Sequence, residues 1–199
     1  MKPHPLLPGL LALPLLHAAA LDLTPRWTDT SIDGIPKRQL YFADGGKKFT
    51  VSLDQETEVT PQLGGTSFRF PKLPDIDFIV LPSKFKPSDA FDETKLVQYR
   101  EAARSLAPAQ SRGVETVGEQ ANPIPINRWQ SFRVKLRFTM NSRLYAQEIT
   151  FLNVSEADQV VLVTSAPERD WSEATERSWQ ILRSWQEMLP GDEAKSKGN

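Results

Sequence analysis

One segment constrains the fold of this chain more than any other, because every second residue in it is apolar. The apolar positions are Phe132, Val134, Leu136, Phe138 and Met140, and the positions between them include Arg133, Lys135 and Arg137. A period of two is typical of a β-strand that buries one face. Asn141 and Ser142 then form a plausible two-residue turn, so the chain is predicted to fold back here as a β-hairpin.

The sequence also predicts the register of this hairpin. A turn at residues 141–142 sets Phe138 opposite Tyr145, Val134 opposite Ile149, Phe132 opposite Phe151, Lys135 opposite Glu148 and Arg133 opposite Thr150. Apolar residues then meet apolar residues, and a cation meets an anion. A slip by one residue would mix the two faces, so the pattern and the turn agree on one register.

Further strands and two helices are predicted around the hairpin. The strands are expected near residues 40–53, 66–70, 76–81, 114–120 and 159–164, and the last of these is apolar on both faces. Helical spacing follows Asp92, a predicted N-cap, and recurs over residues 170–189, where Asp170 and Glu173 resemble a capping box. This order predicts an α+β class: a single domain with a mainly antiparallel sheet flanked by helices.

The first twenty residues resemble an export signal. Lys2 supplies a basic start, residues 6–16 form an apolar run with two prolines, and Ala18 and Ala20 form an Ala-x-Ala cleavage site. The apolar run is too short to span a bilayer, and no later stretch is apolar enough to do so. We therefore expect residues 1–20 to be a signal peptide and the mature protein, from about Leu21, to be periplasmic or secreted.

The rest of the chain divides into three parts. Residues 21–46 are interpreted as an N-terminal extension and the first hairpin strand, because residues 21–38 show no clear periodicity. Residues 47–189 are expected to form the compact domain. Residues 190–199 follow the breaker Pro190–Gly191 and are polar, so a disordered tail is predicted.

Histidine and cysteine are scarce enough to exclude several chemistries. The chain has no Cys, and its two His residues, His4 and His17, both lie in the predicted signal peptide. A mature chain without either residue has no Ser-His-Asp triad, no Cys-His pair and no ordinary zinc site. We therefore predict no catalytic, cofactor or metal site and no enzyme. Without Lys2, the 24 basic residues fall to 23 against 25 acidic ones, which argues against a nucleic-acid partner.

The order of the predicted elements resembles the PsbP/DcrB-like group. The residues that carry the resemblance are the hairpin 132–151, the strand 159–167 and the closing helix through 178–185, and the likeness covers roughly residues 47–189. It implies an α/β/α sandwich. It also implies a non-enzymatic role, because members include extrinsic subunits of membrane complexes, assembly factors, envelope proteins and a nuclear Ran-binding protein. A few members bind cations, but this chain lacks histidines to match the metal sites of the photosystem members.

Two features are candidates for a partner surface, and each has a simpler interpretation. Arg133, Lys135 and Arg137 place three cations on one strand face, which raises the local potential. The simpler interpretation is a solvated face with Lys135 paired to Glu148. Trp179 lies at the edge of the apolar stripe of the last helix, where a tryptophan is a common interface anchor. The simpler interpretation is a tryptophan that covers the rim of the core.

These observations lead to one leading hypothesis and two alternatives. The leading hypothesis is an exported, non-catalytic accessory or binding protein of the cell envelope, whose partner is another envelope protein. The first alternative is a protein that binds a small ligand or a calcium-type cation. The second is an enzyme based on carboxylate or lysine chemistry, which predicts such a group with a shifted pKa in a concave pocket.

Overall fold

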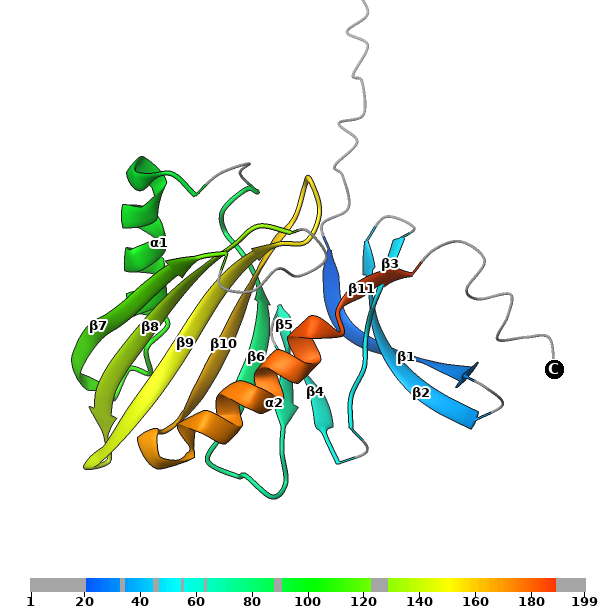
Figure 1. Cartoon of the computed structure of the whole chain (residues 1–199), viewed down its shortest axis with the longest axis horizontal. Coiled ribbons are helices and arrows are strands. Elements are labelled where there is room, and N and C mark those ends of the chain that lie inside the picture. Colours follow the sequence, from blue (N-terminus) through cyan, green and yellow to red (C-terminus); the bar gives the residue numbers. More distant parts are fainter. Residues whose placement is uncertain are drawn as a thin grey trace, which may run out of the picture.

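The part of the chain that the structure describes forms two antiparallel sheets and two α-helices, in agreement with the predicted α+β class (Figure 1). The computed structural model describes residues 21–32, 35–44, 47–54, 56–62, 64–87, 91–122 and 129–188. The predicted signal peptide and the predicted C-terminal tail therefore lie outside the described residues. No helix in these ranges has the length and apolar character needed to cross a membrane.

In the larger sheet the hairpin lies between β10 and the edge strand β7. Its strands follow the order β4 (Glu58–Gln62), β5 (Gly65–Arg69), β6 (Asp77–Pro82), β10 (Gln159–Pro167), β9 (Arg143–Asn153), β8 (Ser131–Met140) and β7 (Arg112–Ala121). The register of β8 against β9 is the predicted one at every pair, including Lys135 opposite Glu148. Asn141 and Ser142 have φ values of 50° and 62°. Two successive residues in the left-handed region match the right-handed twist of the strands they join.

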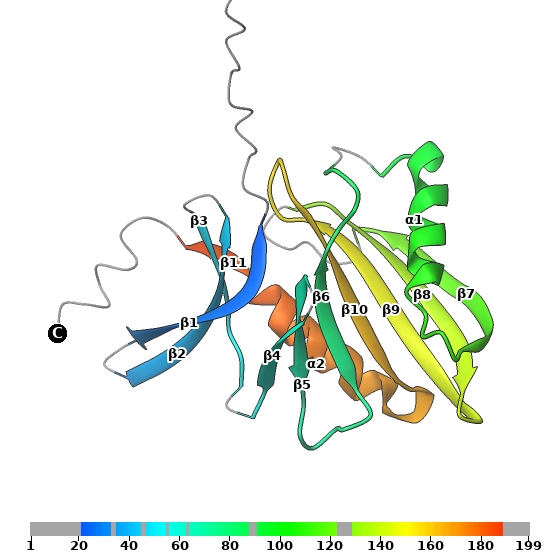
Figure 2. The same cartoon turned by 180° about the vertical axis from the view of Figure 1, so that it is seen from behind.

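The two helices lie on opposite faces of this sheet, as the views from both sides show (Figures 1 and 2). Helix α1 (Glu93–Ser105) covers one face, and α2 (Trp171–Arg183) covers the other after the short 3-10 turn Glu168–Asp170. Neighbouring residues of one strand therefore enter different cores. Phe151 packs on the α1 side, whereas Leu152 packs on the α2 side. The arrangement has the three layers expected of an α/β/α sandwich.

Helix α1 begins as the sequence predicts. The Asp92 carboxylate accepts a hydrogen bond of 3.0 Å from the backbone N–H of Lys95. The buried residues of α1 are Leu96, Tyr99, Ala102 and Ala103. An N-cap of this kind satisfies one of the donors that the first helical turn leaves free.

Helix α2 differs from the prediction at both ends. Its N-cap residue Asp170 makes no capping hydrogen bond and contacts Arg169 instead, so the predicted capping box does not form. The helix ends at Arg183 rather than near residue 189, and the chain continues as β11 (Gln186–Met188). Trp185 is fully buried 5.1 Å from the ring of Phe42, and this burial favours leaving the helix.

The segment interpreted as an N-terminal extension is part of a sheet. Strands β1 (Asp22–Ile32), β2 (Ile35–Asp44), β3 (Lys47–Val51) and β11 form the four-stranded sheet in the order β1-β2-β3-β11. Leu21 and Leu23 are buried in the α2-side core. The expected first hairpin strand is the end of β2, which pairs antiparallel with β3. Residues 21–32 form β1 beside β2, with Ile32 opposite Ile35, although their sequence shows no clear periodicity.

Candidate functional site

An open groove of about 560 Å³ runs along the flank of α2 next to β8. Its lining comes from β8 and from α2: Arg133, Trp171, Ser172, Thr175, Glu176, Trp179, Gln180 and Arg183. The lining thus combines two indole rings with charged and amide side chains. The groove exists because α2 packs on β10 near the middle of the sheet and leaves β8 and β7 beside it.

A buried carboxylate lies behind the groove and contacts two of its lining residues. Trp179 Nε1 donates a hydrogen bond of 3.1 Å to Oε1 of Glu148, which lies on β9. Its Oε2 lies 3.3 Å from Arg133 Nη1 and 3.8 Å from Lys135 Nζ, at ion-pair distances. The guanidinium of Arg133 lies 5.7 Å from the centre of the Trp179 ring, within range of a cation–π interaction. We call these four residues the Glu148 cluster.

Burial dominates the electrostatics of the cluster. The side chain of Glu148 is only 6% exposed, and this desolvation raises the pKa of its carboxyl above the ordinary value of 4.5. The charges of Arg133 and Lys135 and the hydrogen bond from Trp179 oppose the rise in pKa without cancelling it. Arg133 is also fixed from the other side, because its Nη2 donates to Gln120 Oε1 on β7.

The position of Glu148 bears on the enzyme alternative. That alternative predicts a titrating group with a shifted pKa inside a concave pocket. Glu148 has the shifted pKa but does not line the groove, since Trp179 and Arg133 lie between its carboxylate and the hollow. The carboxylate of Glu148 therefore contacts the residues of the groove wall and not the hollow itself.

The structure brings together three of the four candidate residues named from the sequence. Arg133, Lys135 and Trp179 meet at Glu148, whereas Arg137 pairs with Glu168 at 2.8 Å and lies outside the groove lining. Trp179 is 5% exposed and covers the rim of the core, in agreement with the simpler interpretation. The expected pairing of Lys135 with Glu148 is present, but the anion is buried rather than solvated.

The sequence did not predict the positions of two residues at this site. Trp171 lies within the apolar stripe of the last helix by its spacing, yet it is only partly buried and lines the groove. Glu148 was treated as one half of an exposed pair. Strand alternation shows which residues share a face, but it does not show that a helix covers part of that face. The position of Glu148 opposite Thr164 of β10, in the interior of the sheet, was the available signal.

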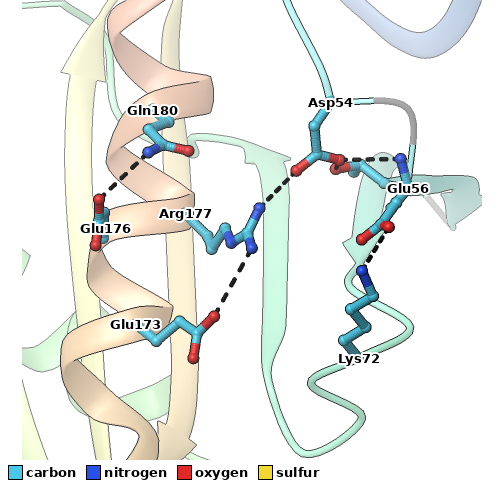
Figure 3. Close-up of polar contacts among 8 residues, drawn as sticks. Asp54, Glu56, Lys72, Glu173, Glu176, Arg177 and Gln180 are labelled. Carbon is cyan, nitrogen blue, oxygen red and sulfur yellow. Dashed lines mark hydrogen bonds and ion pairs between the residues drawn. The ribbon is translucent and has the colours of Figure 1, made fainter.

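The opposite flank of α2 is closed by ion pairs (Figure 3). Arg177 Nη1 lies 2.8 Å from Asp54 Oδ2, and Arg177 Nη2 lies 3.7 Å from Glu173 Oε1. On the groove side, Gln180 Nε2 donates to Glu176 Oε1 over 3.4 Å within the helix (Figure 3). Helix α2 is therefore tied to the segment after β3 on one flank and open to solvent on the other.

Comparisons with known proteins give similarities of fold alone. No family model matches the chain, and no curated protein matches it. LpqN of Mycobacterium tuberculosis, described as involved in cell envelope biogenesis, matches with 12% identity and a TM-score of 0.49, over 83% of this chain and 92% of LpqN. The Ran-binding protein Mog1p of Saccharomyces cerevisiae matches with 10% identity and a TM-score of 0.45, over 82% and 96%.

A third similar structure is the cyanobacterial PsbP of Synechocystis sp. PCC 6803. It matches with 15% identity and a TM-score of 0.43, over 89% of this chain and 95% of that protein. PsbP and a Ran-binding protein are among the proteins to which the sequence resemblance points. At these identities the similarities assign no ligand, partner or activity to this chain.

Proposed function

We propose that the protein is an exported, non-catalytic accessory protein of the cell envelope, and that it binds a partner protein in the groove along α2. The observation that carries the proposal is the lining of that groove. Tryptophan and arginine are the residues most enriched where proteins contribute binding energy to one another. Here Trp171, Trp179 and Arg133 line one open hollow on a rigid helix and strand.

The groove also has suitable chemistry for a segment of a partner chain. Two tryptophans are among its lining residues, and aromatic rings of this kind can pack against an apolar side chain. Arg183 at one end is exposed and makes no ion pair within the described part of the chain, so it is available to an acidic group of a partner. The export part of the proposal is supported by the signal-like sequence of residues 1–20.

Affinity capture from the native envelope tests this function with a matched pair of variants. Gln180→Glu places a second anionic side chain in the groove beside Glu176, where it repels an acidic group of the partner, and Gln98→Glu makes the same change on an exposed position of α1. We expect one stoichiometric partner that is lost with Gln180→Glu and kept with Gln98→Glu. A partner that survives both changes, or recovery of the protein alone, contradicts groove binding.

A second candidate function is the binding of a small apolar ligand on the other side of the sheet. A pocket of about 160 Å³ lies between α1 and the sheet, and its apolar lining includes Phe85, Leu106, Phe151 and Val161. A cavity of about 150 Å³ with such a lining is known to hold a benzene-sized molecule. A melting scan with small aromatic compounds tests this function, and no rise in Tm at millimolar concentration contradicts it.

A further inference from the structure

The start of the described chain is seated against a carboxylate. The backbone N–H of Leu21 donates a hydrogen bond of 3.2 Å to Oδ1 of Asp158, which lies in the turn between β9 and β10. Figures 1 and 2 both show the beginning of β1 beside this turn. The two residues are 137 positions apart, so the contact joins the N-terminal strand to the middle of the larger sheet.

Both partners of this contact are held in place. The side chain of Leu21 is buried in the α2-side core, and the carbonyl of Leu23 accepts a hydrogen bond from Thr66 Oγ1. Asp158 is fixed by its turn, because Ser155 Oγ donates to its Oδ2 and the backbone N–H of Val154 donates to its carbonyl. The distance between the Leu21 nitrogen and the carboxylate is thus set by packing on both sides.

The carboxylate has no cationic partner within the described residues. Asp158 forms no ion pair there with any lysine or arginine, although it is only partly exposed. A neutral amide N–H is a weak partner for such a group. A charged donor at the same position would form a shorter and stronger hydrogen bond.

We propose that the Ala20–Leu21 peptide bond is the processing site of the protein, and that Asp158 is the seat of the new α-ammonium group of Leu21. An endoprotease of the export machinery hydrolyses the bond. The C–N bond breaks, the oxygen of water becomes part of the Ala20 carboxylate, and the two protons of water convert the amide nitrogen of Leu21 into an ammonium group. The ammonium then forms an ion pair that the unprocessed chain cannot form. This inference rests on the export part of the proposed function, but not on the groove.

The geometry also sets the order of events. In the folded protein Leu21 is 8% exposed, so a protease cannot draw the chain on both sides of this bond into an extended active-site cleft. Cleavage therefore precedes folding, and folding then brings the new amine to Asp158. The processed chain gains a stabilising contact that ties its first residue to the β9–β10 turn.

The first test is the N-terminus of the exported protein made from the full chain. Mass spectrometry should find a chain that begins at Leu21. A chain that begins at another residue, or that keeps residues 1–20, overturns the assignment of the site. The N-terminal residue does not depend on partner binding. A chain that begins at Leu21 but captures no partner would therefore contradict groove binding and leave this inference standing.

The second test compares Asp158→Asn in the unprocessed full chain, made in the cytoplasm, and in the processed chain. Asparagine keeps the shape of the turn and an acceptor for Leu21 but removes the charge. We expect the melting temperature to fall by about 2–4 °C more in the processed form. Glu156→Gln, an exposed change in the same turn, should show no such difference. Equal losses for Asp158→Asn in both forms overturn the proposed ion pair.

Discussion

The two faces of strand β8 are built on different principles. On the α1 face, Phe132, Val134 and Leu136 pack against an aromatic group in which the rings of Tyr99 and Phe151 lie 4.7 Å apart. On the α2 face, residues of the same strand hold a buried anion beside an open groove. Each of these apolar residues is adjacent in the chain to a charged one.

The difference separates apolar packing on one face of the sheet from a polar, partly open surface on the other. Apolar packing on the α1 face is non-directional and scales with the area removed from water. The Glu148 cluster depends on the direction of a few hydrogen bonds and charges, and its members can be changed with smaller losses of stability. Substitutions should therefore separate the two roles, and the expected effects are given below from the largest to the smallest.

Truncation on the α1 face should cost the most. Phe151→Ala removes a ring that is 1% exposed and contacts both Tyr99 and Phe85. We expect the free energy of unfolding to fall by about 3–5 kcal/mol, measured by urea denaturation. Leu144→Ala on the same strand is the control, since Leu144 is exposed and should change stability by less than about 0.5 kcal/mol. Equal losses for the two variants would contradict the comparison.

Removing one hydrogen bond from the Glu148 cluster should cost less. Trp179→Phe keeps an aromatic ring over the core rim but leaves Glu148 Oε1 without the indole donor. An unsatisfied buried acceptor costs about 1–3 kcal/mol, so we expect a loss in this range in guanidinium unfolding. A Trp185→Phe variant serves as a reference for the loss of indole volume in the same core. A Trp179→Phe variant as stable as the wild type would show that the hydrogen bond contributes nothing.

The titration of Glu148 should make the free energy of unfolding depend on pH. Burial raises its pKa, so the folded chain binds this proton more tightly than the unfolded chain does. The stabilisation that this group contributes is complete below pH 4.5 and is lost as the pH rises through the folded pKa. The difference in free energy of unfolding between wild type and Glu148→Gln should therefore shift in favour of the variant from pH 4.5 upward.

Measuring that difference also separates Glu148 from the other carboxyls. Hydrogen bonds from Thr24 lower the pKa of Asp22, and hydrogen bonds from Thr57 lower the pKa of Asp54. Their stabilisation is lost at the acid end, below the ordinary value of 3.8, in both proteins. A constant difference between wild type and Glu148→Gln across pH 4.5–7.5 would contradict a raised pKa.

The smallest effect is expected at the edge of the cluster. The side chain of Lys135 is 38% exposed, and its Nζ lies 3.8 Å from Glu148 Oε2. Water screens such a pair, so Lys135→Ala should cost less than about 1 kcal/mol in thermal unfolding. A larger loss would place Lys135 among the groups that hold the buried anion in place.

Local patterns account for the parts of the fold that the sequence predicted. The β8–β9 register follows from alternation and a two-residue turn within about twenty residues, and the start of α1 follows from Asp92 and its neighbours. The cluster residues Arg133 and Lys135 were named from the same pattern. Their role differed from the prediction because the burial of Glu148 depends on α2, which is placed by tertiary packing on β10.

One missed element depends on a contact between distant residues, because residues 186–188 form a strand beside β3, 136 positions away. Residues 21–32 pair with the next strand along the chain, β2, but their sequence shows no clear alternation. Trp185 fits the helical stripe by spacing, but the helix ends at Arg183, and the indole of Trp185 packs against the ring of Phe42 from the segment that follows. Helix spacing and strand burial compete at this residue, and the packing decides.

The pairing of β11 with β3 sets the order in which the fold can be completed during synthesis. Thr50 and Gln186 are partners that lie 136 residues apart. Loop-closure entropy makes such contacts slow to form. Until residues 186–188 have emerged, β3 presents an unpaired edge to its surroundings. An open strand edge can recruit another chain, so the interval before β11 arrives is the period in which this protein is most prone to aggregation.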